Sequence, residues 1–98
     1  MAEPPEVEAL LRNYRTAFLR YLPRREETAL AIAYEIGRSA VADRTSVLVI
    51  TQLHHEVLRE IVADSRPDEV DHVIERAGEF LAEVLASVEM VQRSLHGA

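Results

Sequence analysis

The chain has 98 residues, enough for one small domain with a modest core and too few for two such domains. Its 48% hydrophobic and 29% charged residues are an ordinary composition for a globular protein, and the lack of cysteine excludes disulfides and thiolate metal sites. The net charge is −6, and all eleven basic residues apart from the histidines are arginine. Because an acidic chain repels phosphate backbones, we expect no nucleic-acid partner.

The first residues are acidic and contain two prolines. They lack the basic and then apolar order of a signal peptide, and no apolar run approaches the roughly 18 residues that a membrane span needs. We therefore expect a disordered tail over residues 1–5, a single helical domain over residues 6–98, a cytoplasmic location and no membrane contact.

The first half of the chain predicts two amphipathic helices. The first covers residues 6–22 and is expected to stop before Pro23, because proline lacks a donor and disfavours helix at the residue before it. The second covers residues 24–42. Small residues on its apolar side, including Ala33 and Gly37, would let a neighbouring helix approach closely.

The second half predicts two further helices. The third covers residues 46–63, with Thr45 or Ser46 as its N-cap. The fourth covers about residues 70–95, preceded by Ser65 as a cap and by Pro67 early in the first turn. With loops of about three to five residues, this pattern predicts an all-α fold, an antiparallel up-down-up-down four-helix bundle with a long C-terminal helix.

The fourth helix carries a regular apolar pattern whose gaps alternate between four and three residues. Its members are Val70, Ile74, Ala77, Leu81, Val84, Val88, Val91 and Leu95. This spacing is typical of a heptad seam that presents one stripe to partner helices, on a helix about 40 Å long. We predict that the seam from Val70 to Val91 packs between helices or between two copies in a homodimer.

Candidate catalytic groups are few. Glu69 and His72 form one Glu-x-x-His unit, but a bundle di-iron site needs a second such unit, so we expect no metal and no cofactor. His55 precedes Glu56 on an amphipathic helix, an arrangement found in dimeric histidine kinases. A histidine phosphotransfer bundle with His55 as the phosphoacceptor is therefore the alternative to a non-enzymatic domain.

A second strip lies outside the seam of the fourth helix. Ala82, Ala86 and Met90 follow one another at a spacing of four, and Ala31 lies similarly off the inner stripe of the second helix. Small residues ending in a methionine are a plausible docking surface for another helix or protein. Alanine is also a common helix former, so simple helix filler is an equal alternative.

Several segments together resemble a known family. They are Tyr14–Leu22, Glu26–Leu30, Val49–Leu58, Phe80–Leu85 and Glu89–Arg93. In order and spacing they are similar to the N-terminal domain of RsbU, the PP2C-type serine phosphatase of the bacterial general stress response. The resemblance extends from about Tyr14 to Leu95.

This resemblance implies a helical, usually dimeric regulatory domain, related in fold to a domain of the circadian clock protein KaiA. Such a domain receives a partner-switching activator, RsbT, which has a GHKL kinase-type fold. Binding switches on the phosphatase domain, which dephosphorylates an anti-sigma-factor antagonist and so frees a sigma factor. By position, Ala31, Ala82 and Ala86 fall where the partner face of the family would be.

Overall fold

The computed structural model describes residues 5–96, and its side chains from residue 7 to residue 95. Four long helices and one short one account for nearly all of this part: α1 (Pro5–Arg24), α2 (Glu27–Ala42), α3 (Val47–Asp64), the 3₁₀ helix η1 (Pro67–Glu69) and α4 (Val70–His96). The all-helical prediction is confirmed. Residues 1–4 of the expected tail lie outside the described residues, and Pro5 already belongs to α1.

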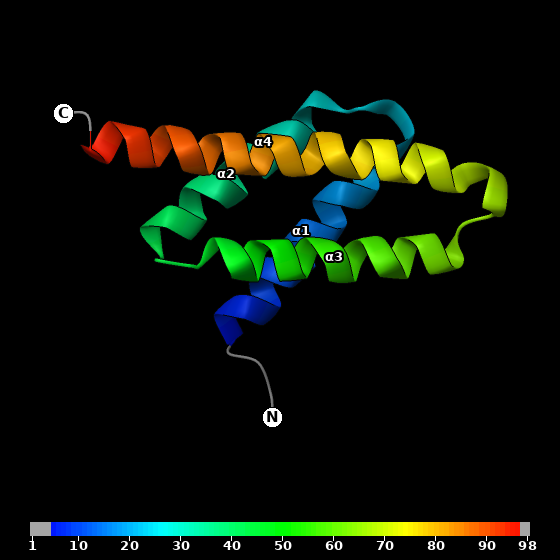
Figure 1. Cartoon of the computed structure of the whole chain (residues 1–98), viewed down its shortest axis with the longest axis horizontal. Helices are drawn as coiled ribbons and strands as arrows, with labels where there is room; N and C mark the ends of the chain where they lie inside the picture. Colours follow the sequence, from blue (N-terminus) through cyan, green and yellow to red (C-terminus); the bar gives the residue numbers. More distant parts are fainter. Residues whose placement is uncertain (1–4, 97–98) are drawn as a thin grey trace.

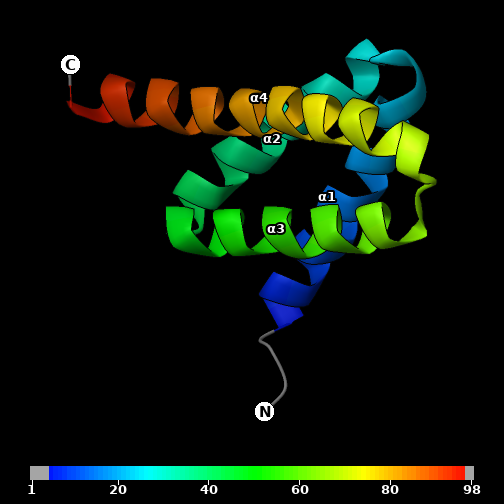
Figure 2. The same ribbon diagram turned by 45° about the vertical axis from the view of Figure 1, so that its right-hand side comes forward.

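The helices form a thin slab in two layers. α3 and α4 lie side by side and run in opposite directions, while α1 and α2 cross behind them at an angle (Figures 1 and 2). The molecule measures 47 × 34 × 19 Å, so its smallest dimension is about two helix diameters. α2 packs on α1 and α4, but no Cα atom of α2 lies within 8 Å of one in α3. α1 and α4 each contact all three other long helices, so these two helices join the layers.

The end of α1 differs from the prediction. The helix continues through Pro23 to Arg24, where the sequence suggested a stop at residue 22. Proline has the φ angle of a helix, and the hydrogen bond that it removes would end on Leu19, which is 47% exposed, so water can reach that carbonyl. The helix ends at Arg24, and the next residue, Arg25, has a φ of 52° and donates its N–H to the Tyr21 carbonyl oxygen at 3.0 Å.

The two serines predicted as caps act differently. Ser46, one of the two residues predicted as alternatives with Thr45, is the N-cap of α3, and its Oγ accepts a hydrogen bond from the Leu48 N–H at 3.1 Å. The prediction for Ser65 is wrong, because this residue ends α3 by donating from Oγ to the Ile61 carbonyl at 2.6 Å. The turn into α4 is capped by Glu69, whose carboxylate accepts from the Arg66 N–H at 3.1 Å.

Aromatic rings from α1 and α4 make the centre of the core. The ring of Phe80 lies edge-on to Tyr14 and Phe18, with centroid distances of 5.1 and 5.5 Å, a favourable geometry for aromatic pairs. The buried core residues are Tyr14, Ala17, Phe18, Tyr21, Ala29, Ala33, Ile36, Ala40, Ile50, Val57, Ala77, Phe80, Val84 and Val88. α1 and α4 thus supply the large side chains, whereas α2 supplies mainly alanines.

The small residues of α2 bring it against α4, as the sequence predicts. A Cβ atom added at Gly37 would overlap both the Oγ of Ser87 and the backbone carbonyl oxygen of Val84. Ser87 is completely buried and satisfies its hydroxyl by donating to the same Val84 carbonyl at 2.9 Å. The contact therefore depends on glycine at position 37.

Candidate protein-docking surfaces

The predicted seam of α4 is divided between the core and the surface. Ala77, Val84 and Val88 are buried, whereas Ile74 is 51% exposed. Of the remaining seam members, Val70, Leu81 and Val91 are half-buried and Leu95 is 70% exposed. The core also takes in Val73 and Phe80, which lie beside the seam. The buried stripe is therefore rotated away from the seam, and one edge of the seam stays uncovered.

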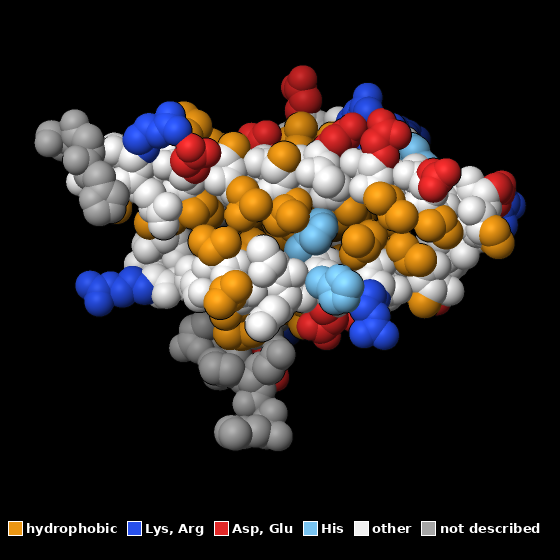
Figure 3. Space-filling view, in the orientation of Figure 1, with side chains coloured by type: hydrophobic (Ala, Val, Ile, Leu, Met, Phe, Trp, Pro, Cys, Tyr) orange, Lys and Arg blue, Asp and Glu red, His pale blue; other side chains and the backbone are white. Residues whose placement is uncertain are grey.

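This uncovered edge belongs to a larger apolar surface, which we call the α3–α4 face. It comprises Val47, Leu58 and Val62 of α3 and Ile74, Leu81 and Leu85 of α4, all exposed or half-buried. Their intervals of four, seven and eleven residues place them on one side of each helix. Figure 3 shows hydrophobic side chains gathered along the line where the two helices meet. A Cβ atom added at Gly78, between Ile74 and Leu81, would meet nothing within 4 Å, so this side of α4 is open.

A histidine–tyrosine pair lies beneath the α3–α4 face. Tyr14 is fully buried, and its hydroxyl lies 2.7 Å from Nδ1 of the half-buried His54. Burial raises the pKa of the Tyr14 phenol and lowers the pKa of His54, and the neighbouring His55 lowers the pKa of His54 further. Both groups are therefore neutral near pH 7, with the phenol donating to Nδ1 and the imidazole proton on Nε2.

The residues predicted to bind a partner are all exposed. Ala31 lies on α2, and Ala82, Ala86 and Met90 lie on α4, where Met90 is 56% exposed. The structure brings Met90 beside α2 in a shallow groove, the α2–α4 groove. It is lined by Tyr34, Arg38, Met90, Val91, Ser94 and Leu95.

The α2 wall of this groove was not among the residues predicted from the sequence. Tyr34 and Arg38 follow Ala31 at spacings of three and seven, so all three share one side of α2. Ala31 thus lies on the continuation of that wall, and Ala86 continues the other wall one turn before Met90. The spacing on α2 could have shown this side, but only the structure shows that it meets α4.

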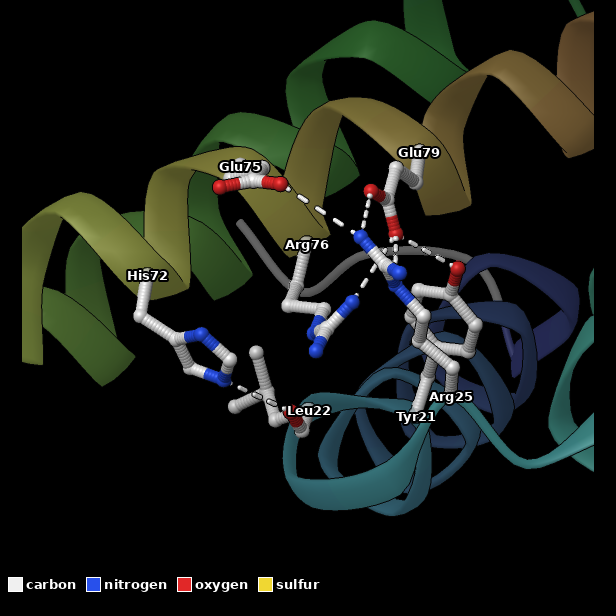
Figure 4. Close-up of polar contacts among 7 residues, drawn as sticks. All are labelled: Tyr21, Leu22, Arg25, His72, Glu75, Arg76 and Glu79. Atoms are coloured by element: carbon white, nitrogen blue, oxygen red, sulfur yellow. Dashed lines mark hydrogen bonds and ion pairs between the residues drawn. The ribbon is translucent and has the colours of Figure 1, made fainter.

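A polar cluster fixes the turn between α1 and α2 onto α4 (Figure 4). The carboxylate of Glu79 accepts from the Tyr21 hydroxyl at 2.7 Å and from two nitrogens of Arg25 at 2.7 and 3.0 Å. Arg76 and Glu75 complete the cluster, with ion pairs of 3.3 Å to Glu79 and 3.4 Å to Arg25 respectively. Because α2 follows this turn directly, the cluster helps to set where α2 starts relative to α4.

These contacts also shift two pKa values. Burial, followed by the bond to Glu79, raises the pKa of Tyr21 to about 12. The Tyr21 hydrogen bond and the Arg25 guanidinium hold the pKa of Glu79 below its usual value. The pair is therefore a neutral phenol on an ionised carboxylate over the whole physiological range.

The two histidines considered as a phosphoacceptor or a metal ligand, His55 and His72, are not among the residues of either docking surface. His55 is exposed on α3, one residue after His54. His72 donates from Nε2 to the Leu22 carbonyl at 3.0 Å, which links α4 to the end of α1 (Figure 4). Among the described residues, no group of three or more His, Cys, Asp or Glu side chains is placed to hold a metal ion. None of the helices between residues 5 and 96 has the length and apolar character needed to cross a membrane.

Comparison with known proteins identifies the family of this small helical domain. Residues 12–91 match the family described as the N-terminal domain of the phosphoserine phosphatase RsbU. The chain belongs to this family. The match runs from within α1 to near the end of α4, so it includes the α3–α4 face and all of the α2–α4 groove except Ser94 and Leu95. Neither a curated protein nor a solved structure gave a significant match.

Membership of the RsbU N-terminal family confirms the suspected resemblance and makes the chain a regulatory rather than a catalytic domain. Membership of this family suggests a role in protein–protein interaction. The α3–α4 face and the α2–α4 groove are therefore the surfaces to which a function is best assigned.

Proposed function

We propose that this RsbU-type domain binds an RsbT-like partner-switching protein, with a GHKL kinase-type fold, through the α2–α4 groove. The observation that carries the proposal is Met90, which is 56% exposed in a groove built jointly by α2 and α4. Methionine is adaptable and common at protein-binding surfaces. The exposed alanines at positions 31, 82 and 86 extend this surface along both helices without bulky side chains that would hold a partner away.

The α3–α4 face is proposed as the homodimer interface. Exposed Ile74, half-buried Leu81 and half-buried Leu85 form an apolar row on one side of α4, opposite apolar residues of α3. A two-fold dimer uses the same patch on both copies, so a self-complementary apolar ridge and groove suits it. Contiguous apolar surface of this kind is otherwise unfavourable in water.

The two surfaces lie on different sides of the same helix, which suggests how the signal is passed on. A partner in the α2–α4 groove contacts α4 on the side where Gly37 and Ser87 pack tightly. A partner that prefers one packing of α2 on α4 shifts the population of α4 positions, and α4 carries the shift into the dimer interface. In a cytoplasmic stress-signalling protein, the output would be an attached PP2C-type phosphatase that acts on an anti-sigma-factor antagonist.

The partner proposal is tested by placing a charge in the docking strip. We expect Ala86→Glu to weaken binding of the RsbT-like protein at least about tenfold, the equivalent of ~1.4 kcal/mol, in isothermal titration calorimetry. Ala63→Glu is the matched control, because Ala63 is equally an exposed helical alanine but lies on α3, away from the groove. It is expected to bind like the wild type.

The opposite pattern would remove this docking assignment. If Ala86→Glu keeps its helical circular dichroism and binds the partner as tightly as Ala63→Glu, the α2–α4 groove is not the site. A second position gives an independent reading, because Met90→Ala removes a large side chain from the groove without adding charge. We expect it to weaken binding less than Ala86→Glu, by about 1 kcal/mol, within the usual range for an interface truncation.

A further inference from the structure

We propose that self-association through the α3–α4 face is controlled by protonation of His54, so that it weakens as the pH falls below neutrality. This inference rests on the proposed homodimer and adds to it a means of regulation. It requires that His54 lies at the interface, that its neutral form is the one the fold needs, and that no nearby carboxylate offsets a positive charge there.

The position of His54 meets the first requirement. On α3 it lies seven residues after Val47 and four before Leu58, so it shares their side of the helix, which borders the α3–α4 face. Its side chain is half-buried in one copy, with the ring edge-on to Tyr14 at 5.8 Å and tilted against Phe18 at 6.2 Å. Histidine side chains are visible among the hydrophobic ones on this face in Figure 3. A second copy docked there would cover the part of the ring that water still reaches.

The hydrogen bond to Tyr14 meets the second requirement. The phenol is fully buried, and Nδ1 of His54 at 2.7 Å is the acceptor for its proton. Protonation turns Nδ1 into a donor, so the phenol proton loses its partner, and a buried donor without an acceptor is costly. The neutral imidazole is thus the form that fits between α1 and α3.

The surrounding charges meet the third requirement. On α3 the neighbouring ionisable group is His55, which offers no carboxylate and lowers the pKa of His54. On α1, next to Tyr14, the guanidinium of Arg15 is held by Glu60 of α3 at 2.9 Å, and this pair is internally neutral.

On α4, the positions facing this side between residues 74 and 88 are Ile74, Gly78, Leu81, Leu85 and Val88, and none of these is ionisable. A proton on His54 is therefore not compensated by a carboxylate from the elements that pack around it.

Linkage gives the sign of the effect. Docking removes more water from His54, so its pKa is lower in the dimer than in the free chain, and the dimer binds fewer protons. The dimer is then favoured at high pH and loses stability as the pH falls through the pKa of the free chain. Exclusion of one proton per copy corresponds to at most about a hundredfold change in the dimer dissociation constant per pH unit.

The test is sedimentation equilibrium of the intact chain between about pH 7.5 and pH 5.0, a range that reaches well below the ordinary histidine pKa because burial lowers the pKa of His54. We expect the dimer dissociation constant of the wild type to rise by about tenfold or more. In His54→Asn the side-chain oxygen stands near the position of Nδ1 and can still accept from Tyr14, but it does not titrate. This variant is expected to dimerise with little pH dependence, whereas the matched control His55→Asn should keep the response of the wild type.

A measurement on the wild type alone protects the test against a variant that folds poorly. Nuclear magnetic resonance titration of the His54 ring should give a lower pKa in concentrated, dimeric samples than in dilute ones, and a smaller difference for His55. A dimer with the same affinity at both pH values, or a response that persists in His54→Asn, overturns the inference and leaves the proposed dimer intact. A chain that is monomeric at every pH overturns both.

Discussion

α4 meets α2 on one side and α3 on the other, and the two contacts are built from different residues. Toward α2 the chain uses glycine, alanine and a buried serine, and Gly37 leaves no room for a further carbon atom beside Ser87. Toward α3 it uses large aliphatic side chains that stay partly uncovered, and Gly78 faces open space. One side is closed by close packing, whereas the other is left available.

This difference shows that a single apolar helix can serve two purposes at once. The buried stripe through Ala77, Phe80 and Val84 holds the domain together. The apolar residues beside it, such as Ile74 and Leu81, add little to the stability of one copy because water still reaches them. Their side chains are therefore free to contribute to contacts with another chain.

The largest loss of stability is expected from a substitution in the buried stripe of α4, which lies between its two sides. Phe80 is completely buried against Tyr14 and Phe18, so Phe80→Ala should lower the free energy of unfolding by about 3–5 kcal/mol. Leu85→Ala, on the open side and only half-buried, should lower it by about 1–2 kcal/mol. Urea denaturation followed by circular dichroism measures both. Equal losses would mean that the two sides of α4 are not different.

A pair of glycine substitutions separates the closed side from the open side. Gly37→Ala should destabilise the chain by about 1–3 kcal/mol, because the backbone carbonyl of Val84 cannot move aside as a side chain would. Gly78→Ala should stabilise it by about 0.5–1 kcal/mol, since alanine is the better helix former and meets no neighbour. The same denaturation experiment measures both changes. A gain of stability in Gly37→Ala would show that α2 does not lie as close to α4 as described.

The polar cluster on the closed side gives a prediction that depends on pH. Tyr21→Phe removes the hydroxyl bond to Glu79 and should cost about 1 kcal/mol near pH 7. The folded chain holds the Tyr21 proton up to a pKa of about 12, while an unfolded tyrosine releases it near 10. Stability should therefore fall as the pH rises from 10 to 12, and Tyr21→Phe should reduce this fall. Thermal melts at several alkaline pH values measure it; an identical alkaline decline in both proteins would contradict this role.

The smallest effect on stability is expected for an exposed ion pair that joins α1 and α3 and does not involve α4. Glu60 accepts two hydrogen bonds from Arg15, both at 2.9 Å, but both side chains are well exposed. Glu60→Gln should therefore lower stability by only about 0.5 kcal/mol, less at high salt. Denaturation at low and high ionic strength checks this. A loss above about 2 kcal/mol would indicate that α1 and α3 are joined mainly by this pair and not by the core.

Much of the helical architecture follows from the sequence. The apolar spacing of three and four residues predicts all four long helices, and residue type alone narrows the cap of α3 to Thr45 or Ser46, of which Ser46 takes the role. The ends near Pro23 and Ser65 were not predicted correctly. Whether α1 continues through Pro23 depends on whether water reaches the carbonyl of Leu19. Whether Ser65 ends one helix or starts the next depends on whether its hydroxyl bonds to a preceding or a following residue. Local composition gives neither.

The surfaces were only partly accessible to sequence reasoning. Regular spacing identified Ile74 and Leu81 as seam residues. Spacing alone does not show that Val73 and Phe80, beside the seam, are buried in the core while Ile74 remains exposed. The exposed strip ending in Met90 was predicted, but its opposite wall, with Tyr34, comes from a different helix. Such a juxtaposition depends on how α2 crosses α4, which is set by the close contact at Gly37 and not by any local pattern.

If the α3–α4 face is kept open for a second copy, a charge placed in it should prevent dimerisation, and sedimentation equilibrium at pH 7.5 measures this. Ile74→Glu puts a charge into the face, whereas Leu19→Glu puts one at a similarly exposed apolar position of α1 outside both surfaces. We expect the wild type and Leu19→Glu to sediment as dimers and Ile74→Glu, still helical, to sediment as a monomer. A dimer that survives Ile74→Glu with unchanged affinity would contradict this expectation.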